Sequence, residues 1–193
     1  MSVVCNAMDT LTKIEYYKSK QKFVELIRGR GDFQETSRGY IIDYSSSFIL
    51  MQATDDFTLN GYSIFPIDTI LEFRHNKHHS FYDKVMKLEK LKQTIGISFS
   101  IDLSNWQSVF KSLKKYKLTI TVECEEPHLE YFCIGSLANV AKSQVSMLYF
   151  SPVGTVDNQP TITKYINITK VAFGDRYANI LTKYLQPEAQ HTT

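Results

Sequence analysis

The amino-acid sequence predicts a mainly β (α+β) fold made of two tandem five-stranded barrels, each flanked by short helices. The 193-residue chain is 43% hydrophobic and contains twelve Tyr and twelve Phe, whereas Gly and Pro are scarce. This composition is typical of a globular β protein. Ten short runs of residues have the length and alternation of strands. They form two sets of five with similar spacing, which indicates an internal repeat.

The first set of strands lies in the first half of the chain. Its members are predicted at 22–28, 38–44, 48–53, 61–65 and 69–74, with a turn at 29–32. Five short strands within about fifty residues are typical of a small barrel. Asp55 and Asp56 follow the third strand, and Asn60-Gly61 is a hairpin signal just beyond them. We interpret the two aspartates as turn residues rather than as an acid/base or cation-binding pair.

The second set repeats the order of the first. Its strands are predicted at 118–124, 131–140, 144–150, 161–166 and 169–173. Val24 precedes Gly39 by fifteen residues, and Ile120 precedes Gly135 by the same distance. Near the end of each set, Ile67 and Ile70 find counterparts in Ile168 and Val171. The second set is longer by about five residues, which we place in the loop 151–160.

A helix is predicted before and after each set of strands. The four helices are expected at 9–19, 80–91, 105–116 and 175–185. Ser104 is the expected N-cap of the third helix and Asp175 of the fourth, because short polar side chains accept hydrogen bonds from the free amides of a helix start. Helix capping therefore explains Asp175 in the segment Gly-Asp-Arg-Tyr better than chemistry does.

The pattern places the two domains at 9–92 and 103–185, with disordered tails at 1–8 and 186–193. The N-terminus lacks the basic and apolar regions of a secretion signal. No run approaches the roughly 18 apolar residues that cross a bilayer. We therefore expect a cytoplasmic protein that makes no membrane contact.

A short helix followed by five bent strands, with a glycine early in the second strand, resembles the Sm-like version of the SH3-type barrel. The resemblance covers residues 9–90 and 103–185. In the first motif of that family, a glycine is followed by an aspartate and then by an asparagine that lines an RNA pocket. Gly39 and Asp43 match the first two positions, but 45–47 offers no asparagine.

The second half departs further from the Sm-like pattern. Gly135 matches, but Asn139 stands where the aspartate is expected. The second family motif, an Ile-Arg-Gly type of turn, is absent from 63–67 and from 164–168. The resemblance implies the barrel fold and assembly through strand edges, and it does not imply binding of uridine.

Three histidines within five residues, His75, His78 and His79, are weak candidates for a metal site, since imidazole is a common ligand. We interpret 74–79 as a solvated loop, because Asn76 and the loss of apolar residues argue against a helix there. No cofactor is predicted.

Lysines concentrate in the middle of the chain, and tyrosines in the first set of strands could stack on bases. The candidate residues for contact with a nucleic acid or a protein partner are Lys111, Lys114, Lys115, Lys117, Tyr40, Tyr44 and Tyr62. The net charge of +2 and pI near 8.3 are weak for a dedicated nucleic-acid domain. Solvated helix faces explain these lysines better, because Lys is ordinary on amphipathic helices.

Catalysis finds no support in the sequence, which contains no hydrolase elbow, Walker loop, dinucleotide fingerprint or paired Cys-x-x-Cys motif. The three cysteines match neither a disulfide framework nor a zinc site. Acidic neighbours would raise the pKa of Cys124 and Cys133, so we expect buried, inert thiols.

The sequence thus predicts a non-enzymatic binding protein that recognises a protein partner or assembles with itself through exposed barrel edges. The alternative is a regulator that binds RNA or DNA through the central lysines and the tyrosines.

Overall fold

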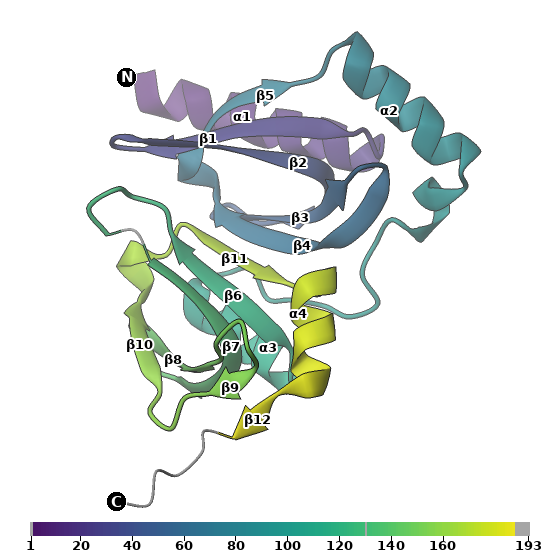
Figure 1. Cartoon of the computed structure of the whole chain (residues 1–193). Coiled ribbons are helices and arrows are strands. Elements are labelled where there is room, and N and C mark those ends of the chain that lie inside the picture. The colour runs from purple at the N-terminus through teal and green to yellow at the C-terminus, as the bar shows by residue number, and fades with distance from the viewer. Residues whose placement is uncertain (1, 130, 188–193) are drawn as a thin grey trace, which may run out of the picture.

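The computed structural model describes residues 2–129 and 131–187, and for 2–9 and 187 only the backbone. These residues form a mainly β structure with one antiparallel sheet of ten strands, a separate two-stranded parallel pair, and four α-helices. The two halves of the chain lie next to each other, the first half in purple and blue and the second in green and yellow (Figure 1).

The first half contributes five neighbouring strands to the sheet. They are β1 (Val24–Arg30), β2 (Phe33–Tyr44), β3 (Phe48–Asp55), β4 (Thr58–Pro66) and β5 (Ile70–Arg74). Their order is β4-β3-β2-β1-β5, so the fifth strand pairs with the first. All five strands that the sequence predicts for this half are present.

The second half contributes the other five strands in the equivalent order. They are β6 (Thr119–Cys124), β7 (Tyr131–Val140), β8 (Gln144–Tyr149), β10 (Thr161–Lys164) and β11 (Lys170–Phe173). Their order is β10-β8-β7-β6-β11, so the last strand again pairs with the first of its half. The short strands β9 (Thr155–Val156) and β12 (Gln186–Pro187) form the separate pair.

The two halves repeat each other down to the register of their strands. Val24 lies opposite Gly39, and Ile120 lies opposite Gly135, which reproduces the fifteen-residue spacing in the sequence. A bulge interrupts the second strand between Ile41 and Asp43, and another between Leu137 and Asn139. Equivalent residues in these strands are 96 positions apart, including at the bulges.

The register corrects the predicted alignment of the last strands. Ile27 of β1 lies opposite Glu72, and the equivalent Glu123 of β6 lies opposite Lys170. Equivalent residues in the fifth strands are therefore 98 positions apart, so Ile70 corresponds to Ile168 and not to Val171. The second half carries two extra residues rather than about five.

The helices cover separate parts of the sheet, and each packs on a different one of four buried apolar clusters. The helix α1 (Ser2–Ser19) buries Ile14 against β1 to β4, and α3 (Trp106–Lys115) buries its apolar stripe in the second half. The helix α2 (Lys77–Leu88) packs Met86 on Phe23 and Tyr40. The short α4 (Arg176–Leu181) places Ala178 beside Ile134 and Phe150.

Several element boundaries differ from the prediction. The helix α1 begins at Ser2 and includes most of the predicted N-terminal tail, while β12 occupies the start of the predicted C-terminal tail; Met1 and 188–193 lie outside the described residues. Asn105, not Ser104, caps α3 by accepting a hydrogen bond from the Ser108 amide. Asp175 caps α4 as predicted, through the Ala178 amide.

Gly39 and Gly135 are required where the second strands curve. A Cβ atom at Gly39 would overlap the backbone carbonyl of Gln52, and one at Gly135 would overlap that of Leu148. These obstacles are backbone atoms of the neighbouring strand, so no side-chain rotation removes them.

We expect Gly39→Ala and Gly135→Ala each to lower the free energy of unfolding by about 2 kcal/mol or more, because overpacking forces the backbone to shift. Gly31 is the control, since it lies in a turn where an added Cβ atom would have no neighbouring atom within 4 Å. Its left-handed φ of 60° is one that Asn adopts, so Gly31→Asn should change stability little. Urea unfolding measures all three variants, and equal effects would contradict the steric explanation.

Candidate functional site

The two halves are joined by direct pairing of β4 with β11, which lie side by side between them (Figure 1). Ile64 lies opposite Val171, and both side chains are fully buried. Beside them, the rings of Tyr62 and Phe173 stack with their centroids 5.2 Å apart. Within the described residues, β4 pairs with β3 and β11, and not with β5 of its own half.

Asn60 and Gly61 belong to this junction rather than to a hairpin. The hairpin turn between β3 and β4 is at Asp56 and Phe57, whose φ angles are 38° and 62°. The Asn60 side-chain oxygen accepts a hydrogen bond of 2.9 Å from the Arg176 amide. At Gly61, a Cβ would crowd the carbonyl of Phe173. The prediction of a hairpin at Asn60-Gly61 is therefore wrong, because the chain entering α4 crosses β4 at this point.

A buried ion pair forms a second link between the halves. The guanidinium of Arg28 on β1 donates to both carboxylate oxygens of Glu125, over 2.9 and 2.7 Å, and its Nε donates to Ser37. The Arg28 side chain is 1% exposed and its guanidinium lies 4.8 Å from the ring centroid of Phe65. Bidentate geometry and full hydrogen bonding are what make a buried charge tolerable.

Electrostatics favour the ionised form of Glu125. Burial raises the pKa of Glu125, but hydrogen bonds and charge from Arg28, with smaller contributions from Thr169 and Lys170, outweigh burial and lower the pKa overall. The Glu125 carboxylate is therefore ionised at neutral pH.

The segment between α2 and α3 completes the junction. Its backbone is held by Gly96, whose amide donates to Gln52 and whose carbonyl accepts from the Tyr62 hydroxyl. Further along, Ile101 and Leu103 enter a core that includes residues of both halves.

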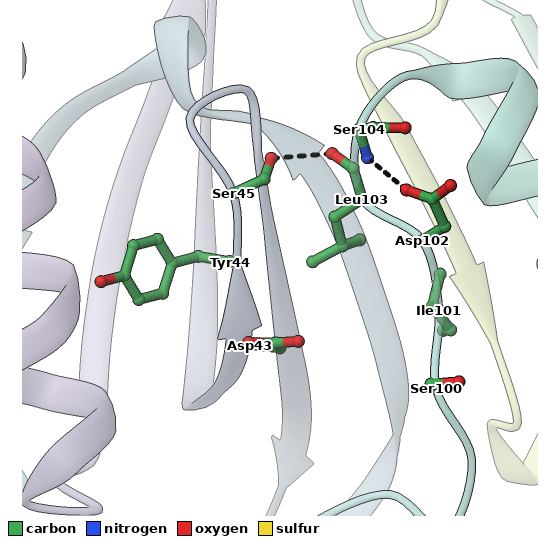
Figure 2. Close-up of a pocket in the computed structure, with 8 residues that line it drawn as sticks. All are labelled: Asp43, Tyr44, Ser45, Ser100, Ile101, Asp102, Leu103 and Ser104. Carbon is green, nitrogen blue, oxygen red and sulfur yellow. Dashed lines mark hydrogen bonds between the residues drawn. The ribbon is translucent and has the colours of Figure 1, made fainter.

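The segment also borders a shallow hollow of about 470 Å³ next to the end of β2 (Figure 2). The Ser45 hydroxyl donates to the Leu103 carbonyl, and the Ser104 amide donates to Asp102. Asp43, which the Sm-like resemblance singles out, forms an ion pair with Lys18. Asp43, Ser45 and Asp102 of the hollow are thus already engaged by other groups of the protein.

The pairing of β4 with β11 leaves one free edge on each half. These edges are β5, the fifth strand of the first half, and β10, the fourth strand of the second half. Unpaired edges expose backbone amides and carbonyls that can pair with another strand. Both edges also expose apolar side chains: Leu71 is 61% exposed on β5, and Ile162 is 58% exposed on β10. The two edges are the candidate functional site.

The structure places the three histidines at the start of α2. This helix begins at Lys77, so the predicted loop over 74–79 is wrong for its last residues. Asn76 is the N-cap, and the His79 ring accepts from the Asn76 amide, which completes a capping box. The ring of His75 contacts the Phe23 carbonyl and the Ser80 hydroxyl. Within the described residues, no group of three potential ligands is positioned to hold a metal ion.

The lysines lie on α3 and directly after it. Lys111, Lys114, Lys115 and Lys117 are exposed, and the Lys114 ammonium donates to the Ala138 carbonyl. Binding of RNA or DNA through these residues stays a prediction.

The three tyrosines are engaged with the protein itself. Tyr40 is fully buried and its hydroxyl donates to Asp83, so its ring has no exposed face for a base. Tyr44 donates to Glu15, and Tyr62 belongs to the junction described above.

Cys124 and Cys133 are buried and unpaired, as expected. Burial, with the charges of Glu126 and Glu125, raises the pKa of the Cys124 thiol to about 11. Burial also raises the pKa of Cys133. Both are therefore protonated at neutral pH, and thiols in that form are poor nucleophiles.

No family model, no curated protein and no solved structure matches the chain. Among the helices of the described residues, none combines the length and apolar character needed to cross a membrane.

We expect Glu125→Ala to lower the free energy of unfolding by about 3 to 5 kcal/mol, since it leaves the Arg28 charge buried without a partner. The double variant Arg28→Met, Glu125→Leu should be closer to the parent protein, because it removes both charges. A double-mutant cycle in urea measures the coupling, and additive effects would contradict it.

The same pair predicts how stability depends on pH. Because the pKa of Glu125 is lower in the folded chain than its usual 4.5, the ionised carboxylate stabilises the fold above that pH. This contribution is lost as the pH falls through the folded-state pKa. The acid destabilisation of the parent protein should therefore be steeper than that of Glu125→Gln.

Proposed function

We propose that this chain is a non-enzymatic assembly protein that binds further copies of itself through its two free strand edges. The observation that carries the proposal is the internal pairing of β4 with β11, a fourth strand with a fifth strand. The free edges are the remaining fifth strand, β5, and the remaining fourth strand, β10. A second copy can therefore continue the sheet by repeating between molecules the contact that already exists within one.

The repeat defines which residues would meet. Ile64 and Val171 face each other in the internal junction, and their equivalents at the free edges are Ile162 and Phe73. Ile64 is fully buried, whereas Ile162 is 58% exposed. Pairing in the same register would cover Ile162 with Phe73 of the next copy. Removing such apolar area from water favours association.

Neighbouring residues are compatible with this register. Thr163 would lie opposite Glu72 of the next copy, and Lys164 opposite Leu71. Lys164 and Leu71 would then share one face of the sheet, where the methylene stem of the lysine can pack on the leucine. Because a β10 edge binds a β5 edge, the contact is head-to-tail, and successive copies form a ring or a filament.

We further propose that each half is an Sm-like barrel that remains open between its fourth and fifth strands. The strand order with the fifth strand beside the first, and the glycine at the bend of the second strand, support this interpretation. The two buried, unpaired thiols fit the reducing cytoplasm that the sequence predicts.

Light scattering over a wide concentration range tests the self-association. We expect the mass to rise with concentration, and Ile162→Glu to weaken the association about tenfold or more, because it buries a charge at the contact. Leu71→Lys should have a similar effect, since it places a like charge opposite Lys164. Phe81→Glu is the control, because Phe81 is equally exposed but lies on α2, away from both edges.

Mixing the two edge variants tests the head-to-tail pairing. Ile162→Glu keeps an intact β5 edge and Leu71→Lys keeps an intact β10 edge, so each alone should be largely monomeric and an equimolar mixture should form a one-to-one dimer. A parent protein that remains monomeric at every concentration would refute the proposal. A mixture that does not associate would refute the head-to-tail geometry.

A further inference from the structure

A groove of about 900 Å³ lies between the two halves. It is on the side where the chain of each half passes from its fourth strand to its fifth strand. The first half contributes the start of β3, the turn η1 (Ile67–Thr69) and β5. The second half contributes the start of α3 and the turn η3 (Tyr165–Asn167). The volume is within the range of sites for small molecules.

Polar and charged residues line part of the groove, and the rest of its wall is formed by aliphatic and aromatic side chains. They include Phe48, Ile67, Phe73, Trp106, Tyr165 and Ile168. The rings of Phe48 and Trp106 pack with their centroids 4.5 Å apart, and both residues are buried. Their fixed packing makes this part of the groove preformed, which lowers the entropy cost of binding a ligand.

Exposed apolar side chains also lie at the mouth of the groove. Leu71 from β5 is 61% exposed, and Ile166 from η3 is 75% exposed. Single exposed apolar residues are common on protein surfaces. Here two of them, from opposite halves of the chain, border the same apolar groove, so an apolar ligand would be contacted from both sides.

Charged side chains of both signs border the groove: Lys13 and Arg30 are cationic, and Asp68 and Glu72 are acidic. Asp68 forms an ion pair of 3.1 Å with Arg30, and Glu72 is bonded to Arg74 at 2.9 Å. Both acidic side chains that border the groove therefore already have cationic partners. A charged ligand would have to compete with these pairs or lose part of its hydration, whereas an uncharged ligand would do neither.

We infer that this groove binds a small uncharged molecule with a mainly apolar surface. The apolar body would lie against Phe48 and Trp106, and Ile166 would cover it from the mouth. The exposed hydroxyls of Ser46 and Ser47 also border the groove. They would donate hydrogen bonds to, or accept them from, a polar group at one end of the ligand. The inference does not rest on self-assembly, because one copy of the chain supplies every wall.

Two related dyes test both the apolar and the uncharged character of the ligand. N-phenyl-1-naphthylamine is uncharged, and 1-anilinonaphthalene-8-sulfonate adds one negative charge to the same ring system. Trp106 is the only tryptophan of the chain, so its fluorescence reports binding in this groove. We expect the uncharged dye to quench Trp106 saturably and to bind about tenfold or more tightly than the sulfonate.

A pair of matched variants locates the binding. Ile166→Glu places a charge at the mouth and should weaken the uncharged dye about tenfold. Ile180→Glu is the control, because Ile180 is an exposed isoleucine on α4 that does not border the groove. The titrations are made on the full chain at a concentration where light scattering gives a single mass. Absence of saturable quenching, equal affinity for the two dyes, or no weakening by Ile166→Glu would each overturn the inference.

Discussion

The pairing of β4 with β11 is the contact on which the arrangement of this molecule depends. A strand edge with unpaired amides and carbonyls must find a partner or remain exposed to water. Each half has a fourth and a fifth strand with such an edge, and the structure pairs one of each. The buried pair of Arg28 and Glu125 then fixes the first strand of one half to the end of the first strand in the other.

That single pairing also determines which surfaces remain available. It leaves β5 and β10 as the outer strands, and it brings η1 next to η3 so that the groove forms between the halves. Assembly and ligand binding would share Leu71, which lies on β5 and at the mouth of the groove. A ligand in the groove could therefore alter the affinity of the β5 edge, because both would contact the same side chain.

The local sequence was sufficient to predict the ten strands of the large sheet and the repeat, since alternation and the spacing of Val24 from Gly39 are local signals. The partner of β4 was not predictable, because Ile64 and Val171, which face each other, are 107 residues apart (171 − 64) and no pattern in a single sequence links them. The hairpin prediction at Asn60-Gly61 is wrong for the same reason. The hydrogen bond that holds Asn60 comes from Arg176 at the start of α4, far along the chain. The start of α2 was missed because His79, rather than Glu or Gln, completes its capping box.

Hydrogen exchange of the backbone amides, measured at several protein concentrations, tests the central claim most directly. Pairing between copies would protect amides of β5 and β10 together as the concentration rises, while amides of the interior strand β2 would keep the same exchange rates. Ile162→Glu should abolish the added protection at both edges. Exchange in β5 and β10 that does not depend on concentration would contradict the account.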